Sequence, residues 1–419
     1  MRRLRGLLPC RLVAIAGLVA FAACGATRVA PPPASASAPH GDVADHASAA
    51  ASRGSLLLVG GGLDDDASPV YQRLLALAAR AGEARVVVMT AATGPQDEEA
   101  TDKTEALRTW APTVAVEVVR RETPTDATVA AIDRASALLF TGGNQERITA
   151  RYRPNDADTP EWLAMRRLLD RGGVIAGCSA GCAMMGQRML VGGRSAQALG
   201  IPRAQAAGAN GATGAPSTTT AAGAADHAAG AGAGSAAAAA AEPAPLGPQL
   251  GPGMKFLPSG LTDSHFFERD RTGRLAAALR ASGERFGLAV GEDAAVAIDL
   301  ATGDVTGVTP SESLFVDAAH AAPSPNGIVG LRARLISQGD IVSLRAPLPT
   351  TPPPAVGQTI ARRVPIAEPG QNRQLAMWRV FRQAAVPGAG VHALQLDGWR
   401  VRVEADVDGW VAFVVERAN

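Results

Sequence analysis

Residues 174–186 read VIAGCSAGCAMMG, in which an apolar run meets a glycine and continues into a helix-forming run. The segment Gly177–Gly181 within it fits the pattern G-x-S-x-G, which is typical of a tight turn from a strand into a helix. Only small flanking residues let the neighbouring backbone approach such a turn, which holds its central side chain clear of the sheet. The following N–H groups point to where an oxyanion would form. The stretch therefore predicts a sheet whose strand ends carry the chemistry.

Three nucleophilic side chains lie in this stretch, and the glycine spacing favours one of them. Centred on Ser179, the motif has both of its glycines, whereas centred on Cys178 it would be flanked by Ala176 and Ala180. Cys182 lies one turn further along. We therefore take Ser179 as the candidate nucleophile and interpret the two cysteines as small core residues that pack the turn. A chance match is the alternative in a chain this rich in glycine and alanine, but the preceding apolar strand favours the motif.

Apolar or β-branched segments alternate with segments of helical periodicity along the first part of the chain. The predicted strands are 55–59, 85–89, 113–119, 137–140 and 174–176, and the predicted helices are 70–81, 126–135 and 162–171. This alternation predicts a mostly parallel sheet covered by helices on both faces. The glycine-rich turns 60–62, 142–143 and 177–181 each follow a strand, so they fall on the carboxyl edge of the sheet, where such folds bind ligands.

Two changes in composition divide the rest of the chain. Residues 204–252 consist largely of Ala, Gly, Thr and Pro, which cannot bury enough apolar surface to offset the loss of chain entropy, so we predict a disordered insertion. Ordered patterns then resume, with a helix at 274–282, strands at 286–290 and 294–300, and a closing strand pair over 331–344. The main domain is thus 53–346. Residues 347–419 form a C-terminal extension with two or three antiparallel strands and no assigned chemistry.

The net charge excludes one class of function, and the N-terminus indicates an exported protein. The 419 residues carry a net charge of +1, which argues against a nucleic-acid-binding protein. The apolar run Leu12–Ala23 follows several arginines and, at about 12 residues, is too short to span a bilayer, so 1–23 is predicted to be a signal peptide. Cys24 follows two alanines, as in the lipobox of bacterial lipoproteins, with plain secretion as the alternative. Residues 24–52 then form a flexible tether, and we expect a periplasmic or extracellular protein, anchored through lipid at Cys24.

A nucleophilic serine needs a general base, and the chain has six histidines. We favour His265 because it lies between apolar neighbours in a loop suited to a strand end; a structural histidine is the alternative. The other five lie in the tether, the insertion, a loop or the tail (His40, His46, His227, His320 and His392). A third group must orient the imidazole. Asp263 lies two residues away and Glu292 follows a predicted strand, and the spacing leaves both open.

Arg269, Arg271 and Arg274 concentrate positive charge beside His265. A run of this kind at a predicted helix start is usually a solvated helix end with local ion pairs. Its functional interpretation is a cationic patch that binds a substrate carboxylate through bidentate guanidinium geometry. The sequence alone leaves both interpretations open.

With these stretches together, residues 53–346 resemble the serine peptidase family that contains cyanophycinase and aspartyl dipeptidase. The order and combination of the matching stretches are specific to that family. They are 60–62 (GGG), 90–93 (TAAT), 140–145 (FTGGNQ), 177–181 (GCSAG), 263–266 (DSHF) with the three arginines, and 291–293 (GED). Gln145 after Gly-Gly-Asn resembles the cyanophycinase branch of the family rather than the dipeptidase branch.

The resemblance implies a flavodoxin-like α/β fold, related to class I glutamine amidotransferases, and a set of site residues. Ser179 would be the nucleophile, His265 the base and Glu292 the third member. The residues implied to supply oxyanion N–H groups are Gly143 and Ala180, and those implied to bind substrate are Gln145, Asp263, Arg269, Arg271 and Arg274. The implied substrate is cyanophycin, multi-L-arginyl-poly-L-aspartate, cleaved to β-Asp-Arg dipeptides without a metal or organic cofactor. The sequence leaves the oligomeric state open, with a homodimer among the options.

The chain also departs from the family pattern. Cys178 stands where the family usually has Thr, Cys182 where it has Ala, and Ser264 where it has Gln. Two further functions stay open: an exported aspartyl or isoaspartyl dipeptidase of the same family, and a non-catalytic binding lipoprotein on the same fold. Gln145 and the arginines count against the first, and the joint presence of the serine, histidine and glutamate counts against the second.

Overall fold

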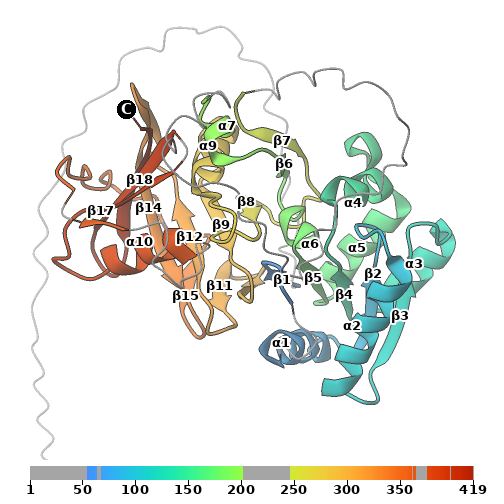
Figure 1. The fold of residues 1–419 in the computed structure, drawn as a ribbon. Coiled ribbons are helices and arrows are strands. Elements are labelled where there is room, and N and C mark those ends of the chain that lie inside the picture. The colour runs from blue at the N-terminus through green and yellow to red at the C-terminus, as the bar shows by residue number, and fades with distance from the viewer. Residues whose placement is uncertain are drawn as a thin grey trace, which may run out of the picture. The chain divides into compact units, whose positions relative to one another are not determined.

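A central sheet of mainly parallel strands organises the N-terminal half of the molecule (Figure 1). The computed structural model describes residues 54–63, 68–201, 246–360, 362–364, 375–396 and 398–418. Parallel strands run in the order β1-β5-β4-β2-β3, and β10, β11 and β15 extend the sheet beside β1 in antiparallel fashion. These strands are β1 (Ser55–Val59), β2 (Arg85–Met89), β3 (Ala115–Val119), β4 (Ala137–Phe140), β5 (Val174–Cys178), β10 (Ala295–Asp299), β11 (Asp304–Gly307) and β15 (Ile341–Ser343). The predicted, mostly parallel α/β sheet is confirmed.

Helices cover both faces of this sheet. They are α1 (Ser68–Ala79) and α2 (Gln96–Trp110) on one face, and α3 (Thr125–Arg134), α4 (Gln145–Tyr152) and α5 (Pro160–Asp170) on the other. Because successive residues of a strand point to opposite faces, Leu57 packs in the core with α1 and α2, whereas Leu56 and Leu58 pack in the core with α3, α4 and α5. The strands β1, β4 and β5 are buried along their whole length, as expected of strands covered on both sides.

A second, largely antiparallel sheet contains the C-terminal part of the chain. Its order is β8-β9-β12-β14-β19-β18-β17-β16, with β13 paired to β14. The strands are β8 (Leu261–Asp263), β9 (Phe286–Val290), β12 (Ser313–Asp317), β13 (Ala322–Ser324), β14 (Gly327–Ile336), β16 (Arg362–Arg363), β17 (His392–Leu396), β18 (Trp399–Ala405) and β19 (Val411–Arg417). The helices α9 (Thr272–Ser282) and α10 (Ala376–Ala384) share one apolar core with this sheet. The confirmed β-rich C-terminal region is therefore continuous with the sheet that carries β8 and β9.

Three details differ from the sequence-based expectations. The predicted strand pair over 331–344 is wrong, since β14 and β15 lie in different sheets: a turn closed by hydrogen bonds from Ser337 to Asp340 redirects the chain, and β15 pairs with β11. The predicted insertion 204–252 falls largely outside the described residues, but its end, Gln249–Pro252, forms β7, which pairs with β6 (Arg188–Gly192). Finally, β19 pairs with β14 across the predicted domain boundary at 346.

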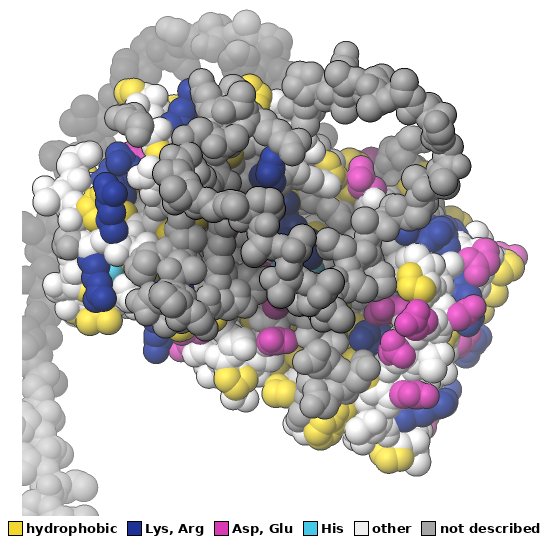
Figure 2. Space-filling model, viewed as in Figure 1, with side chains coloured by type: hydrophobic (Ala, Val, Ile, Leu, Met, Phe, Trp, Pro, Cys, Tyr) yellow, Lys and Arg dark blue, Asp and Glu magenta, His cyan; other side chains and the backbone are white. Residues whose placement is uncertain are grey.

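The surface and the helices add two general observations. In Figure 2, acidic and basic side chains are interspersed, which agrees with a net charge close to zero. Within the ranges that the structure describes, every helix is too short or too polar to cross a membrane. The predicted signal peptide, Cys24 and the tether lie outside the described residues.

Candidate active site

Ser179 lies on the turn between β5 and the short helix α6 (Ala180–Ala183), with a left-handed backbone angle φ of 50°. The glycines on either side are sterically required. A Cβ on Gly177 would lie 2.2 Å from the carbonyl oxygen of Gly181, and a Cβ on Gly181 would lie 2.8 Å from Phe140. The Ser179 N–H donates to the carbonyl of Val59 at 2.9 Å, which ties the turn to the end of β1. The motif therefore forms the strained turn that the sequence predicts, with the hydroxyl at the carboxyl edge of the sheet.

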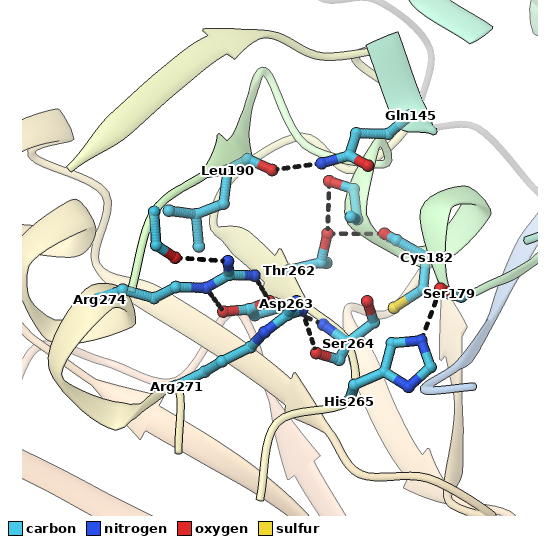
Figure 3. A network of polar contacts seen from close by, with 12 residues as sticks. Gln145, Ser179, Cys182, Leu190, Thr262, Asp263, Ser264, His265, Arg271 and Arg274 are labelled. Atoms are coloured by element: carbon cyan, nitrogen blue, oxygen red, sulfur yellow. Dashed lines mark hydrogen bonds and ion pairs between the residues drawn. The ribbon is translucent and has the colours of Figure 1, made fainter. Parts of the chain in front are cut away.

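His265 follows β8 and reaches the serine directly. Its Nε2 lies 2.7 Å from the Oγ of Ser179 (Figure 3). The backbone N–H of His265 donates to the carbonyl of Gly60 at 2.8 Å, and a Cβ on Gly61 would lie 2.1 Å from the imidazole carbon Cε1. The glycine-rich turn after β1 thus leaves the space in which the imidazole sits. The structure brings together two residues that are far apart in the sequence.

Glu292, two residues after the end of β9, completes the chain of contacts. Its Oε1 lies 2.7 Å from the Nδ1 of His265. The same glycine-rich turn holds this loop, because the N–H of Asp293 donates to the carbonyl of Gly61 at 3.1 Å. A carboxylate at Nδ1 favours the tautomer with a proton on Nδ1, which leaves Nε2 free to accept the proton of Ser179.

Asp263, the other candidate for the third position, lies in a separate buried network. Its side chain is 0% exposed, and its carboxylate accepts from Arg274 Nε at 2.8 Å and from Arg271 Nη1 at 3.1 Å. Arg274 also donates to the carbonyl of Gly193 at 3.0 Å, and the whole network lies beside His265 in Figure 3. The carboxylate that contacts the imidazole is thus that of Glu292, as the family resemblance implies, whereas Asp263 pairs with the two arginines. The substrate-binding role implied for Asp263 stays a prediction.

The three predicted arginines thus separate into two kinds. Arg271 and Arg274 form local ion pairs with Asp263, as the structural interpretation expects, but they are largely buried rather than solvated. Burial lowers the pKa of Arg271 to about 10, which leaves it charged at neutral pH. Arg269 is exposed beside the site. Arg269 is thus the one exposed residue of the three.

The turn after β4 supplies the opposite wall of the site. Gly142 lies against Ser179, since a Cβ on it would be 3.5 Å from the serine Cβ. Gly143 has φ of 129°, and a Cβ there would lie 2.3 Å from the carbonyl oxygen of Ala92, so only glycine fits. Ala180 is the first residue of α6, a position whose N–H has no acceptor within the helix. Gln145, at the start of α4, donates from Nε2 to the carbonyl of Leu190 at 2.8 Å.

Burial sets the protonation of the groups around the serine. Burial and then the charge of Arg269 lower the pKa of His265, against the opposing effect of Glu292, so the imidazole is neutral at pH 7. Burial raises the pKa of the Cys178 thiol to about 11 and that of Cys182 well above its usual value. Both thiols are therefore protonated, and they pack in the cores on opposite faces of the sheet. Sulfur chemistry at this turn is disfavoured.

Glu268 is a residue of this region that sequence reasoning missed. Burial raises the pKa of its carboxyl, backbone hydrogen bonds oppose this rise, and the nearby charges of Glu292 and Asp293 add to it. A Cβ on Gly291 would lie 3.4 Å from its Oε1, so the carboxyl packs directly behind the backbone that carries Glu292. The sequence offers no signal for this placement, because it depends on how the loops after β8 and β9 pack together.

Parts of this chain are similar to known proteins. Residues 56–199 match the model of peptidase family S51. The chain is 26% identical to the cyanophycinase of Trichormus variabilis (strain ATCC 29413 / PCC 7937) over 221 residues, which are 50% of this chain and 58% of that protein. It is 24% identical to the cyanophycinase of Synechococcus elongatus over 235 residues, 54% of this chain and 58% of the relative.

A solved structure of a peptidase from an acI-B1 Actinobacterium superimposes with a TM-score of 0.45 at 15% identity, covering 70% of this chain and 98% of that one. The matches to the two cyanophycinases span a little more than half the length of each relative, 58% in both cases. The family resemblance expected from the sequence is confirmed by the family model and by these relatives.

Proposed function

Since residues 56–199 carry the pattern of peptidase family S51, we propose that this protein is a serine-type peptidase that hydrolyses cyanophycin to β-Asp-Arg dipeptides. The observation that carries the proposal is the unbroken series of contacts from Ser179 Oγ to His265 Nε2 and from His265 Nδ1 to Glu292 Oε1, each at 2.7 Å. Nucleophile, base and orienting carboxylate in this arrangement suit acyl transfer.

The proposed mechanism follows from the protonation of these groups. The Oγ of Ser179 attacks a backbone carbonyl carbon of the substrate while the neutral His265 accepts the hydroxyl proton at Nε2. Glu292 stabilises the imidazolium that forms. His265 then gives the proton to the leaving amine, and water, activated by the same imidazole, hydrolyses the acyl-enzyme. The N–H groups of Gly143 and Ala180 are the proposed donors to the oxyanion. Loss of one such donor typically raises the activation barrier by about 3–4 kcal/mol.

The choice of substrate has separate support. The relatives of this chain include proteins named cyanophycinase, and cyanophycin presents many carboxylates, to which the exposed Arg269 is complementary. Asp263, Arg271 and Arg274 are largely buried in ion pairs with one another, so we propose Arg269 and Gln145 as the first contacts of the substrate. We also propose, from the N-terminal sequence, that the protein is exported and lipid-anchored at Cys24.

The substrate is tested by incubating the purified protein with insoluble cyanophycin and, in parallel, with α- and β-linked Asp-X dipeptides. We expect the polymer to dissolve and mass analysis to identify β-Asp-Arg, with the dipeptides left intact. Cleavage of the dipeptides alone would instead identify an aspartyl or isoaspartyl dipeptidase. If the protein binds these compounds but cleaves none, the binding-protein alternative is favoured.

The charge of Arg269 leads to a prediction about the pH dependence of kcat/KM. Because its charge lowers the pKa of His265, Arg269→Gln should raise that pKa. The base must be neutral to act, so a higher pKa moves the acidic limb of kcat/KM to higher pH. Arg269→Lys keeps the positive charge and should leave the limb near its wild-type position. A limb that stays in place in Arg269→Gln would show that this charge does not act on the base.

A further inference from the structure

We propose that the C-terminal extension, residues 347–419, is a positioning element for Glu292, acting through helix α10 and the loop Val308–Glu312. The inference rests on the proposed peptidase function, since it concerns the carboxylate that orients the base. The residues that carry it, which we call the brace, are Trp378 and Arg382 of α10 together with Glu312. The family match ends at residue 199, well before these residues.

Helix α10 packs against the second sheet. One face of the helix, with Met377, Val380 and Phe381, is buried in the core that this sheet shares with α9. The ring of Phe381 meets that of Phe413 in β19 edge to face, with the centroids 5.4 Å apart. Since β19 also pairs with β14, the helix is held to the body of the molecule by both packing and strand pairing.

Two side chains of α10 that lie beside this buried face hold Glu312 as donors. Trp378 donates from Nε1 to Glu312 Oε2 at 2.5 Å, and Arg382 donates from Nη1 to Glu312 Oε1 at 2.8 Å. Both oxygens of the carboxylate are thus engaged by one helix. The Glu312 side chain is 11% exposed, so its contacts are partly shielded from water, and the pair of donors restricts its orientation as well as its position.

The loop that ends at Glu312 packs along the segment that carries Glu292. The N–H of Ala295 donates to the hydroxyl of Thr309 at 3.0 Å, and the N–H of Val308 donates to the carbonyl of Ala295 at 2.9 Å. At the other end of the segment, a Cβ on Gly291 would lie 3.5 Å from the carbonyl oxygen of Glu312. The loop therefore contacts the chain on both sides of Glu292.

This arrangement matters because the Glu292 side chain is 35% exposed. Burial alone does not fix a carboxylate that is this open to water, so its 2.7 Å contact with His265 depends on where the backbone of Gly291–Ala295 is held. A displacement of about 1 Å in a catalytic group costs on the order of a hundredfold in rate. The brace supplies the restraint on one side of this segment, and the glycine-rich turn after β1 supplies it on the other.

The test compares the variant Trp378→Phe/Arg382→Met with Arg400→Met. The control variant breaks the ion pair between Arg400 and Glu416, whose Nε and Oε1 are 2.5 Å apart. This pair also lies in the extension, but it joins β18 to β19. In the brace variant we expect kcat to fall about ten- to a hundredfold with KM nearly unchanged. The acidic limb should move to lower pH, because Glu292 raises the pKa of His265 and a loosened Glu292 raises it less. The control should keep the wild-type kcat and limb.

A second readout separates this inference from the proposed function. NMR titration of the His265 imidazole reports its pKa whether or not a substrate is known, and thermal unfolding reports the folded fraction. A lowered His265 pKa in a folded brace variant supports the inference even if no peptide is cleaved. Should the double variant not fold, Arg382→Met alone is informative because Arg382 is 61% exposed, with Arg382→Lys as its rescue. An unchanged His265 pKa and kcat in a folded variant would overturn the brace.

Discussion

Replacement of Ser179 by Ala is expected to abolish hydrolysis while leaving the fold intact. The Ser179 hydroxyl lies against the base, with its Oγ 2.7 Å from His265 Nε2. Loss of a serine nucleophile that works with a histidine typically lowers kcat by about 10⁶-fold. Alanine keeps the small size that the turn requires, so circular dichroism and the unfolding temperature should stay close to those of the wild type.

Cys182→Ala is the matched control for this variant, since it removes a thiol one turn along the same segment. Its sulfur is buried and protonated at neutral pH, so hydrolysis should persist. The pair of variants therefore assigns the nucleophile. Full activity in Ser179→Ala, or loss of activity only in Cys182→Ala, would show that the serine is not the reacting group.

The second large effect concerns the two carboxylates that spacing alone left open and between which the family resemblance favoured Glu292. Glu292→Gln should lower kcat by about 10⁴-fold, because an amide at this position no longer favours the tautomer whose Nε2 accepts the serine proton. The side chain is 35% exposed, so the fold should tolerate the change. Steady-state kinetics with the polymer substrate measure the effect.

Asp263→Asn should act on stability instead. Its carboxylate is buried and neutralises Arg271 and Arg274, and removing one partner of a buried ion pair typically costs about 3–5 kcal/mol. Denaturant unfolding would measure this loss. The opposite pattern, with Glu292→Gln unstable but active and Asp263→Asn stable but inactive, would mean that the orienting carboxylate has been misidentified.

Much of the central sheet could be predicted from the sequence because its signals are local. Strands β1, β2 and β4 are short, nearly unbroken apolar runs, and such runs are typical of parallel strands buried on both faces. Helix α2 was not predicted: its first turn carries three acidic residues and few of its residues are buried, so it lacks a clear apolar stripe. The pairing of β15 with β11 was also missed, because an alternating pattern identifies a strand but not its partner.

The site shows the same division between local and long-range information. Ser179 could be found from its neighbours, since the steric demand of the turn is met by two adjacent glycines. The choice between Asp263 and Glu292 depends on which side chain is buried under the arginines, and the role of the arginines depends on which of them face that carboxylate. Glu268 and the brace depend entirely on contacts between distant segments, for which the sequence carries no local signal.

The central claim is that Ser179 is activated by His265, and labelling with a fluorophosphonate tests it most directly. The reagent should phosphonylate the wild-type protein at neutral pH, and mass spectrometry of the digest should locate the label on the peptide that contains Ser179. His265→Ala should lose this labelling. A folded wild-type protein that stays unlabelled, or that carries the label on another residue, would contradict the account.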